Sequence, residues 1–198
     1  MPPKLFNLQG HRLILASKSP RRQELLKGLG FDFEVRTKEI DEDYSDALVR
    51  EEIPLYLSKK KAEAFRDELK ANEILITSDT VVCLGDAVFN KPETPQEAVD
   101  MILSLRGKAH EVITGVCLTS VNNQSAFTDI TTVTFSNLDR SEIEFYVDVY
   151  KPFDKAGAYG IQEWIGYAGI EKIDGSYFNV VGLPTQKLYV ELKKFLKL

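Results

Sequence analysis

The stretch "LILASKSPRRQELL", residues 13–26, joins an apolar run to a helical pattern through a short polar loop. The apolar run predicts a strand over about residues 12–16. Pro20 stands where a helix would begin and Gly30 stands where it would end, so we expect a helix over about residues 20–29. The stretch therefore predicts a strand, a loop and a helix in succession, which is the first unit of an α/β fold.

The same alternation of strand-like and helical patterns continues along the chain. We expect further helices at about 54–70, 94–107 and 139–150 and from Pro184 onward. Thr94 is expected to cap the second of these, with Pro95 at the first position and Glu97 at the third, and the helix from Asp139 is also expected to be capped. We expect further strands at 31–37, on either side of Ser78-Asp79-Thr80, on either side of Gly85-Asp86, around a turn at 122–124, and on either side of Asp174-Gly175. Because hairpins are mixed with crossover helices, the sequence predicts an α/β fold with a mixed twisted sheet and flanking helices. It shows no repeat or flexible linker, so we expect one domain over residues 1–198.

Composition and charge argue against several classes of protein. The chain of 198 residues has a net charge of −5, which argues against broad electrostatic binding to nucleic acid or to anionic lipid. No apolar run approaches the roughly 18–20 residues that span a bilayer. The two cysteines, Cys83 and Cys117, lie in apolar strand-like stretches, where a buried thiol is the ordinary interpretation. We therefore expect a cytoplasmic protein with no nucleic-acid or membrane partner.

Two arginines stand at the end of the predicted helix that repels positive charge. If Ser19 caps this helix, Arg21 and Arg22 fall in its first turn, where the macrodipole disfavours a cation by about 0.3–1 kcal/mol. An external anion would explain them, because helix N–H groups, the hydroxyls of Ser17 and Ser19 and the guanidinium groups could together hold phosphate. Alternatively, both arginines point into water and pair with surface acids. The spacing leaves both interpretations open.

Two further charges stand where the pattern predicts apolar surroundings. On a helix over 54–70, one face carries Leu57, Lys61, Ala64 and Phe65. Lys61 therefore either extends its ammonium to the edge of the core or reaches an anion. Asp79 lies between the apolar runs "EILIT" and "VVCLG", where an unpaired carboxylate is costly. It needs a cation, a metal or a strand end, although residues 78–80 could also form a bulge or a turn.

These charged groups suggest a reaction class. Phosphoryl-transfer enzymes use carboxylates as metal ligands, and they use lysines, arginines and serines to hold and neutralise phosphate. The sequence lacks a G-x-x-x-x-G-K-[ST] loop, a G-x-S-x-G elbow and a G-x-G-x-x-G fingerprint. Its two histidines, His11 and His110, lie in no catalytic signature, so proton transfer would fall to carboxylates and lysines. By local criteria alone, the acidic run at 39–44 is a solvated loop and Lys91 is a turn lysine.

A series of motifs occurs in fixed order from about Leu13 to Leu188. The motifs are "ASKSPRRQELL", Asp41-Glu42, "LSKKKAEA", "SDTVV", "NKP", "HEVITGV", "DKAGAYGIQ" and "IDGSYFNVVGLP". This ordered set resembles the family of Maf-like nucleoside triphosphate pyrophosphatases. The resemblance implies a mixed α/β fold of two lobes around a deep cleft. It also implies metal-dependent hydrolysis of a nucleoside triphosphate to the monophosphate and pyrophosphate, and the family expectation is a homodimer.

The resemblance also implies roles for individual residues. By analogy, the catalytic set is Glu42, Lys61, Asp79 and Lys91. The phosphate-facing loop would consist of Ser17, Ser19, Arg21 and Arg22. Asp79 would be the base or metal ligand that prepares water for attack on the α-phosphorus, Glu42 would share the metal, and the lysines would neutralise the growing charge. The cofactor would be a divalent cation, Mg²⁺, Mn²⁺ or Co²⁺.

The residues Arg21, Thr80 and Gln162 resemble those of the family branch that prefers dTTP and UTP, and that branch can extend to modified pyrimidine nucleotides. A glutamine amide offers both a donor and an acceptor, as pyrimidine edges require. Two alternatives stay open. A sister branch, with another residue after the Ser-Pro pair, prefers 7-methyl-GTP. A non-catalytic, nucleotide-binding regulator of septum formation would bind nucleotide without turnover.

Overall fold

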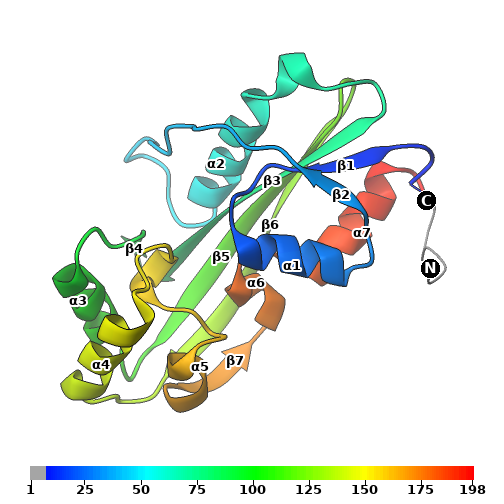
Figure 1. Cartoon of the computed structure of the whole chain (residues 1–198). Helices are drawn as coiled ribbons and strands as arrows, with labels where there is room; N and C mark the ends of the chain where they lie inside the picture. Colours follow the sequence, from blue (N-terminus) through cyan, green and yellow to red (C-terminus); the bar gives the residue numbers. More distant parts are fainter. Residues whose placement is uncertain (1–7) are drawn as a thin grey trace. The chain divides into compact units, whose positions relative to one another are not determined.

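The computed structural model describes residues 8–198 and contains a mixed sheet with flanking helices (Figure 1). Its strands are β1 (Arg12–Leu15), β2 (Phe33–Val35), β3 (Glu73–Leu84), β4 (Ala87–Phe89), β5 (Ala109–Thr119), β6 (Gln124–Phe135) and β7 (Ile170–Asp174). They pair in the order β2-β1-β3-β5-β6-β7, and β4 pairs with β3. β1 is parallel to β2 and β3, whereas β4 and β7 are antiparallel to β3 and β6. The mixed α/β sheet predicted from the sequence is confirmed.

The chain divides into two compact units. The first unit comprises the chain up to Asp79 together with Thr114–Asp129 and Gly182–Leu198, and the second comprises Thr80–Ile113 and Ile130–Val181. Strands β3, β5 and β6 contribute residues to both units, because each passes from one unit to the other along its length. Each unit has an apolar core of its own.

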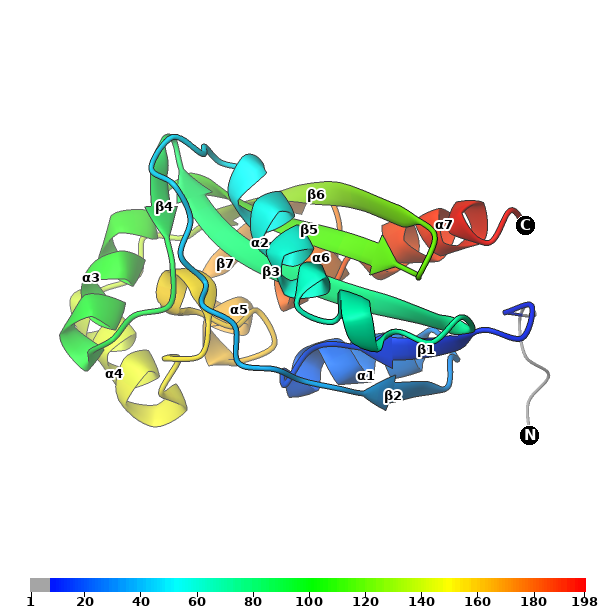
Figure 2. The same ribbon diagram turned by 90° about the horizontal axis from the view of Figure 1, so that it is seen from above.

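In the first unit, alternate side chains of β1 and β3 pack on opposite faces of the sheet. Its helices are α1 (Pro20–Gly28), α2 (Glu52–Glu63), the 3₁₀ helix η1 (Arg66–Glu68) and α7 (Thr185–Phe195). On one face, Leu13 and Ile74 share a core with apolar residues of α1 and α7. On the other face, Ile14 and Leu75 pack with Ala62 of α2. The period-two alternation of a strand thus places α1 and α7 on one side of these strands and α2 on the other (Figures 1 and 2).

The second unit contains the two helices that were predicted at 94–107 and 139–150, together with three shorter ones that were not predicted. Its helices are α3 (Pro95–Leu105), α4 (Arg140–Tyr150), the 3₁₀ helix η2 (Ala156–Ala158), α5 (Trp164–Ala168) and α6 (Tyr177–Val181). Thr94 Oγ1 accepts a hydrogen bond from Glu97 N at 3.1 Å, which confirms the predicted cap of α3. Asp139 and Glu142 form a capping box at the start of α4. The apolar faces of α3 and α4 share one core.

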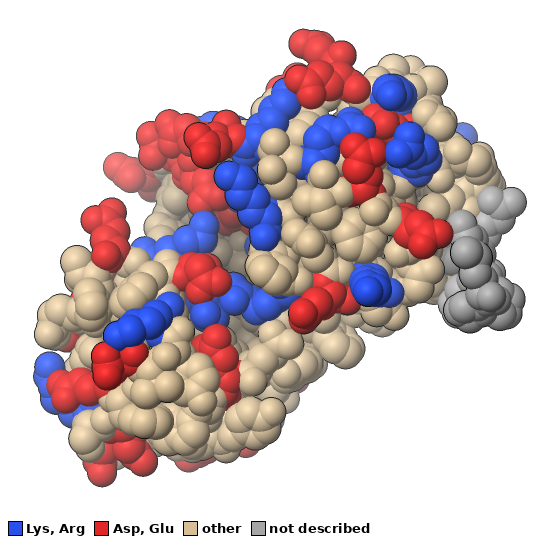
Figure 3. All heavy atoms as spheres, in the orientation of Figure 1, with Lys and Arg blue, Asp and Glu red and all other residues tan. Residues whose placement is uncertain are grey.

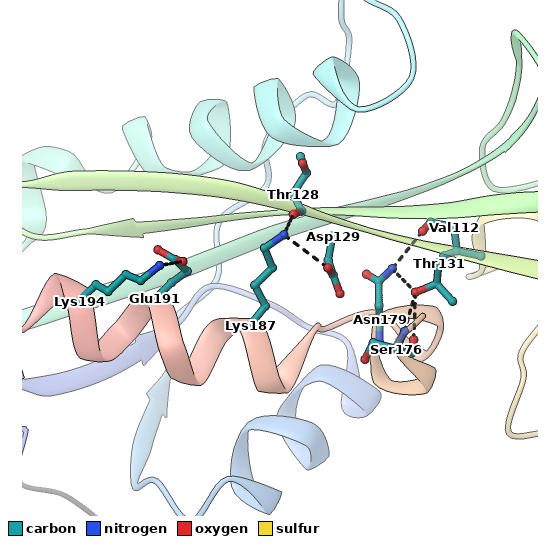
Figure 4. A network of polar contacts seen from close by, with 9 residues as sticks. All are labelled: Val112, Thr128, Asp129, Thr131, Ser176, Asn179, Lys187, Glu191 and Lys194. Atoms are coloured by element: carbon teal, nitrogen blue, oxygen red, sulfur yellow. Dashed lines mark hydrogen bonds and ion pairs between the residues drawn. The ribbon is translucent and has the colours of Figure 1, made fainter. Parts of the chain in front are cut away.

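The prediction of strands on both sides of Asp174-Gly175 is wrong for the second side, which is helix α6. Ser176 Oγ accepts a hydrogen bond from Asn179 N at 3.3 Å near the start of this helix. Asn179 is fully buried, and its side chain donates to Val112 O and to Thr131 Oγ1, each at 3.0 Å (Figure 4). Because these partners lie far away in the sequence, the tertiary contact outweighs the strand propensity of the local run.

Two element boundaries also differ from those predicted. β3 continues through residues 78–80, so this segment is not a turn. Its pairing with β1 ends at Ile76, and its neighbour on the other side is β5. The helix predicted over 54–70 is α2, and it ends at Glu63. Ala64, which was predicted on the apolar face, therefore lies beyond the helix and is exposed. Ala62 is buried in the core instead.

The surface of the described residues carries both signs of charge. Lysines and arginines are interspersed with aspartates and glutamates over the face drawn in Figure 3.

At the start of β3, the fully buried Glu73 accepts hydrogen bonds from Arg36 at 3.0 and 3.1 Å. These hydrogen bonds lower the pKa of Glu73 to about 2, although burial acts in the opposite direction. No helix within residues 8–198 is long and apolar enough to cross a membrane.

Candidate active site

The order of the strands reverses at β1 in the first unit. The chain runs from β1 through α1 to β2 on one side, and then through α2 to β3 on the other side of β1. In open α/β sheets, ligands bind outside the carboxyl ends of the strands at such a point. The loop after β1 lies beside β3 there, because Ala16 N donates to Ile76 O at 2.9 Å. We therefore place the candidate site at the carboxyl end of β1.

Lys61 connects two carboxylates in this region. Its Nζ lies 2.6 Å from Asp79 Oδ1 and 2.7 Å from Glu42 Oε1. The side chains of Lys61 and Asp79 are only 13% and 10% exposed, whereas Glu42, in the loop before α2, is 45% exposed. Charge-assisted hydrogen bonds of this length supply the cation that a carboxylate inside a strand requires. The two charges that the sequence placed in apolar surroundings therefore neutralise each other.

Local structure determines where these two groups meet. Lys61 lies in the last turn of α2, where the helix macrodipole favours a cation. Asp79 lies two residues after Thr77, and the two side chains therefore share one face of β3. Thr77 Oγ1 donates to Ser58 O at 2.7 Å, which shows that this face is the one covered by α2. The position of α2 on β3 thus fixes the distance between the ammonium and the carboxylate.

Arg22 donates to backbone carbonyls from two distant segments of the first unit. Its Nε lies 2.8 Å from Gly182 O, and its Nη1 lies 3.0 Å from Ser78 O. Burial lowers the pKa of Arg22 and the nearby Arg21 acts in the same direction, whereas the carboxylate of Asp79 opposes them. These acceptors show that Arg22 has partners within the chain itself. They also brace the peptide that precedes Asp79.

The loop between β1 and α1 carries two more predicted phosphate-binding residues. Ser17 is buried, and its Oγ accepts a hydrogen bond from Ser19 N at 3.2 Å. Gln23 Nε2 donates to Ser17 O, also at 3.2 Å. Ser19 occupies the N-cap position, but its side chain forms no capping hydrogen bond, and the first turn of α1 has no acidic residue. The predicted side-chain cap is therefore wrong, and α1 begins in the way that suits an external anion.

Glu42 and Asp79 present the oxygen ligands that Mg²⁺ and similar cations prefer. Because one oxygen of each lies within 2.7 Å of Lys61 Nζ, the two oxygens are separated by no more than twice that distance. Glu42 and Asp79 would hold such a cation through carboxylate oxygens. The described residues hold no group of three His, Cys, Asp or Glu suited to a metal. The metal role of Glu42 and Asp79 stays a prediction from the resemblance.

Three of the predicted site residues belong to the second unit. Thr80 follows Asp79 in β3 and is half-buried, Lys91 is exposed in the connection from β4 to α3, and Gln162 is exposed just before α5. Their roles stay predictions from the resemblance. Sequence reasoning missed the part played by Gly182, because a carbonyl acceptor leaves no side-chain signal.

Comparison with known proteins agrees with the family resemblance. The family model described as Maf-like protein matches residues 12–195. The dTTP/UTP pyrophosphatase of Phocaeicola vulgatus is 54% identical over 96% of this chain and 99% of its own length. The proteins of the same name from Bacteroides thetaiotaomicron and Porphyromonas gingivalis are 53% and 46% identical, each over 96% of this chain and over 99% and 98% of their own lengths.

Similarity to a solved structure is weak. The nucleoside-triphosphatase / dITP/XTP pyrophosphatase of Mycobacterium abscessus is 10% identical, with a TM-score of 0.45 over 94% of this chain and 96% of that one. Neither fold nor function is inferred from so distant a likeness. The family match covers nearly the whole chain, and the three relatives share about half of its residues. The chain therefore belongs to the family of Maf-like proteins.

Proposed function

We propose that this protein is a nucleoside triphosphate pyrophosphatase that hydrolyses dTTP and UTP to the monophosphate and pyrophosphate. Relatives with the name dTTP/UTP pyrophosphatase, 46% and 54% identical over nearly the full chain, support the proposal. The observation that carries it is the ammonium of Lys61 between Asp79 and Glu42 at the carboxyl end of β1. This arrangement combines a candidate base, a cation and a helix terminus suited to anions.

In the proposed reaction, Asp79 accepts a proton from water while the water oxygen attacks the α-phosphorus. The bond between this phosphorus and the oxygen that bridges to the β-phosphorus breaks, and pyrophosphate leaves with that oxygen. General-base catalysis of this kind contributes about 10²–10⁴-fold to the rate. Asp79 is suited to this role because Lys61 fixes its carboxylate and Arg22 braces the preceding peptide.

Positive and polar groups balance the charge of the triphosphate in this proposal. Lys61 and Lys91 neutralise the charge that grows on the phosphates and on the leaving pyrophosphate. The residues that bind the phosphates are Ser17, Ser19, Arg21 and Arg22. A divalent cation, Mg²⁺, Mn²⁺ or Co²⁺, held by Glu42 and Asp79 would polarise the phosphate oxygens and lower the pKa of bound water.

The proposed preference for pyrimidine nucleotides rests on Arg21, Thr80 and Gln162. The amide of Gln162 can donate to one pyrimidine edge atom and accept from another. A preference for 7-methyl-GTP is the alternative, and a direct comparison of kcat/KM for 7-methyl-GTP, dTTP and UTP decides between them.

The proposal is tested by incubating the protein with a panel of nucleoside triphosphates and a divalent cation and identifying every product. We expect dTTP and UTP to give the monophosphate and pyrophosphate. Asp79→Asn should lower kcat by about 10²–10⁴-fold. Asp43→Asn, in the same exposed acidic loop as Glu42, is the matched control and should keep wild-type turnover.

Release of orthophosphate in place of pyrophosphate would contradict the proposal. So would full turnover by Asp79→Asn. Tight binding of dTTP by the wild-type protein without any product would instead support a non-catalytic nucleotide-binding regulator.

A homodimer and a cytoplasmic location also stay predictions. Light scattering on the purified protein measures the mass in solution, and a monomeric mass contradicts the dimer. Fractionation of cells that express the protein tests its location.

A further inference from the structure

The second unit contains an ion-pair network around the buried Lys155, outside the candidate site. Lys155 is only 8% exposed, and its Nζ lies 2.7 Å from Asp154 Oδ1 and 3.1 Å from Glu163 Oε1. The other carboxylate oxygen of Glu163 accepts a hydrogen bond from the hydroxyl of Tyr146, a fully buried residue of α4. Burial and the contact with Glu163 raise the pKa of Tyr146, so its hydroxyl stays a donor. Both oxygens of Glu163 therefore have partners inside the protein.

Such a network is poorly explained by stability alone. Removing a lysine and a carboxylate from water carries a desolvation penalty that can exceed their mutual attraction. Apolar side chains of similar size often stabilise a protein equally well at such positions. A network of such hydrogen bonds does, however, fix one geometry. The question is then which part of the chain this network holds in place.

The network holds the segment from Lys155 to Glu163 at both of its ends. Between them, Gly160 N donates to the hydroxyl of Tyr146 at 2.9 Å, and Gly160 O accepts from Glu163 N at 3.0 Å. A Cβ at Gly160 would lie 2.9 Å from both Glu163 Oε2 and Lys155 Cε. The backbone at this position therefore packs directly against the ion pair, with no room for a side chain.

Gln162 is the exposed residue next to this network. Ile161 before it is buried, and Glu163 after it is paired on both oxygens. Tyr159 is also buried, and its hydroxyl lies 2.8 Å from His110 Nε2. The backbone around Gln162 is therefore held on both sides, and Gln162 itself is exposed. An amide held in this way loses less conformational entropy when it binds a ligand.

We propose that Glu163 is a positioning residue: through Lys155 and Tyr146 it holds the backbone that presents Gln162, and it thereby sets the preference of the enzyme for pyrimidine nucleotides. This inference rests on the proposed function, because it assigns to Gln162 a contact with the base. It adds Glu163, Lys155 and Tyr146 to the residues that decide which nucleotide is hydrolysed.

The first variant is Glu163→Gln, which keeps the size of the side chain and removes its charge. We expect KM for dTTP to rise about two- to tenfold, the effect of losing one hydrogen bond, while kcat stays near the wild-type value. The ratio of kcat/KM for dTTP to that for 7-methyl-GTP should fall by the same factor. Tyr146→Phe, which removes one hydroxyl, should shift both quantities in the same direction and guards against a Glu163 variant that does not fold.

The matched control is Glu144→Gln, which breaks the exposed Arg140–Glu144 pair of α4. It should change neither KM nor the ratio. The decisive comparison is a cycle with Gln162→Ala. If Glu163 acts through Gln162, Glu163→Gln should cause no further loss of preference when Gln162 is already Ala.

Three results would overturn the inference. Variants of Glu163 and Tyr146 that unfold at lower temperature but keep the wild-type preference would show a purely structural role. An equal loss of preference in the Gln162→Ala background would show that Glu163 does not act through Gln162. Absence of dTTP hydrolysis by the wild-type protein would instead remove the proposed function, and this inference with it.

Discussion

Gly115 of β5 lies where the backbone of α2 approaches the sheet closely, and its replacement tests how the site is held together. A Cβ built at Gly115 lies 2.3 Å from Pro54 O, whereas ordinary van der Waals contacts of a Cβ begin at 3.4 Å. In Gly115→Ala, α2 and β5 must therefore separate by about 1 Å, because Pro54 O is helix backbone rather than the mobile end of a side chain.

This displacement has a defined consequence for the candidate site. Lys61 lies on α2, about two turns after Pro54, so it moves with the helix. The contacts of 2.6 and 2.7 Å from Lys61 to Asp79 and Glu42 would lengthen beyond the usual range of a charge-assisted hydrogen bond. A misplacement of about 1 Å costs up to about 10²-fold in rate, and the overpacking destabilises the fold by about 1–3 kcal/mol.

The assay is steady-state hydrolysis of dTTP together with thermal unfolding. For Gly115→Ala we expect kcat to fall by about 10–100-fold and the midpoint of unfolding to fall as well. Gly28→Ala at the end of α1 is the matched control, because a Cβ there meets nothing within 4 Å. It should keep wild-type kcat. A folded Gly115→Ala protein with wild-type kcat would refute the reasoning that the packing of α2 on the sheet sets the position of Lys61.

Two other predictions concern titratable side chains, Lys61 and His110. Lys61→Met should abolish turnover and yet raise the affinity for Mn²⁺ in the absence of nucleotide, because the ammonium no longer competes for Asp79 and Glu42. Electron paramagnetic resonance measures this affinity, and Lys60→Met, which removes a contact to a backbone carbonyl, is the control. Unchanged Mn²⁺ affinity in Lys61→Met would contradict the shared site. Burial lowers the pKa of His110 from 6.5 to about 4. Between pH 6.5 and pH 4, His110 is therefore protonated in the unfolded chain but not in the folded protein. The free energy of unfolding should therefore fall as the pH is lowered from 6.5 toward 4. Urea unfolding of His110→Gln should show a weaker dependence of this free energy on pH. An identical pH dependence in the variant would exclude His110 as its source.

Several elements were predictable because their signals are local. The cap at Thr94 and the capping box at Asp139 each involve residues within one helical turn. The hairpin of β3 and β4 follows from the turn at Gly85-Asp86. Such features depend on neighbours along the chain, so a single sequence is enough to predict them.

The candidate site was predictable only in part. The unusual positions of Lys61 and Asp79 marked them as functional candidates, but the sequence did not show that they would pair. The interpretation of Arg22 required the structure, because its carbonyl acceptors are 56 and 160 residues away in the chain. Backbone carbonyls are present at every residue, so no pattern of side chains indicates which of them will accept.

The sequence by itself determined the alternation of strands and helices, their caps and turns, and the ordered motifs of the family. Only the tertiary structure decided that β3 passes unbroken through Asp79, that the segment after Gly175 is helical, and which buried charges meet. The physical reason is the range of the interactions. Caps and periodicity act over a few residues, whereas an ion pair inside a core forms only after the folded chain has brought distant segments together and excluded water from between them.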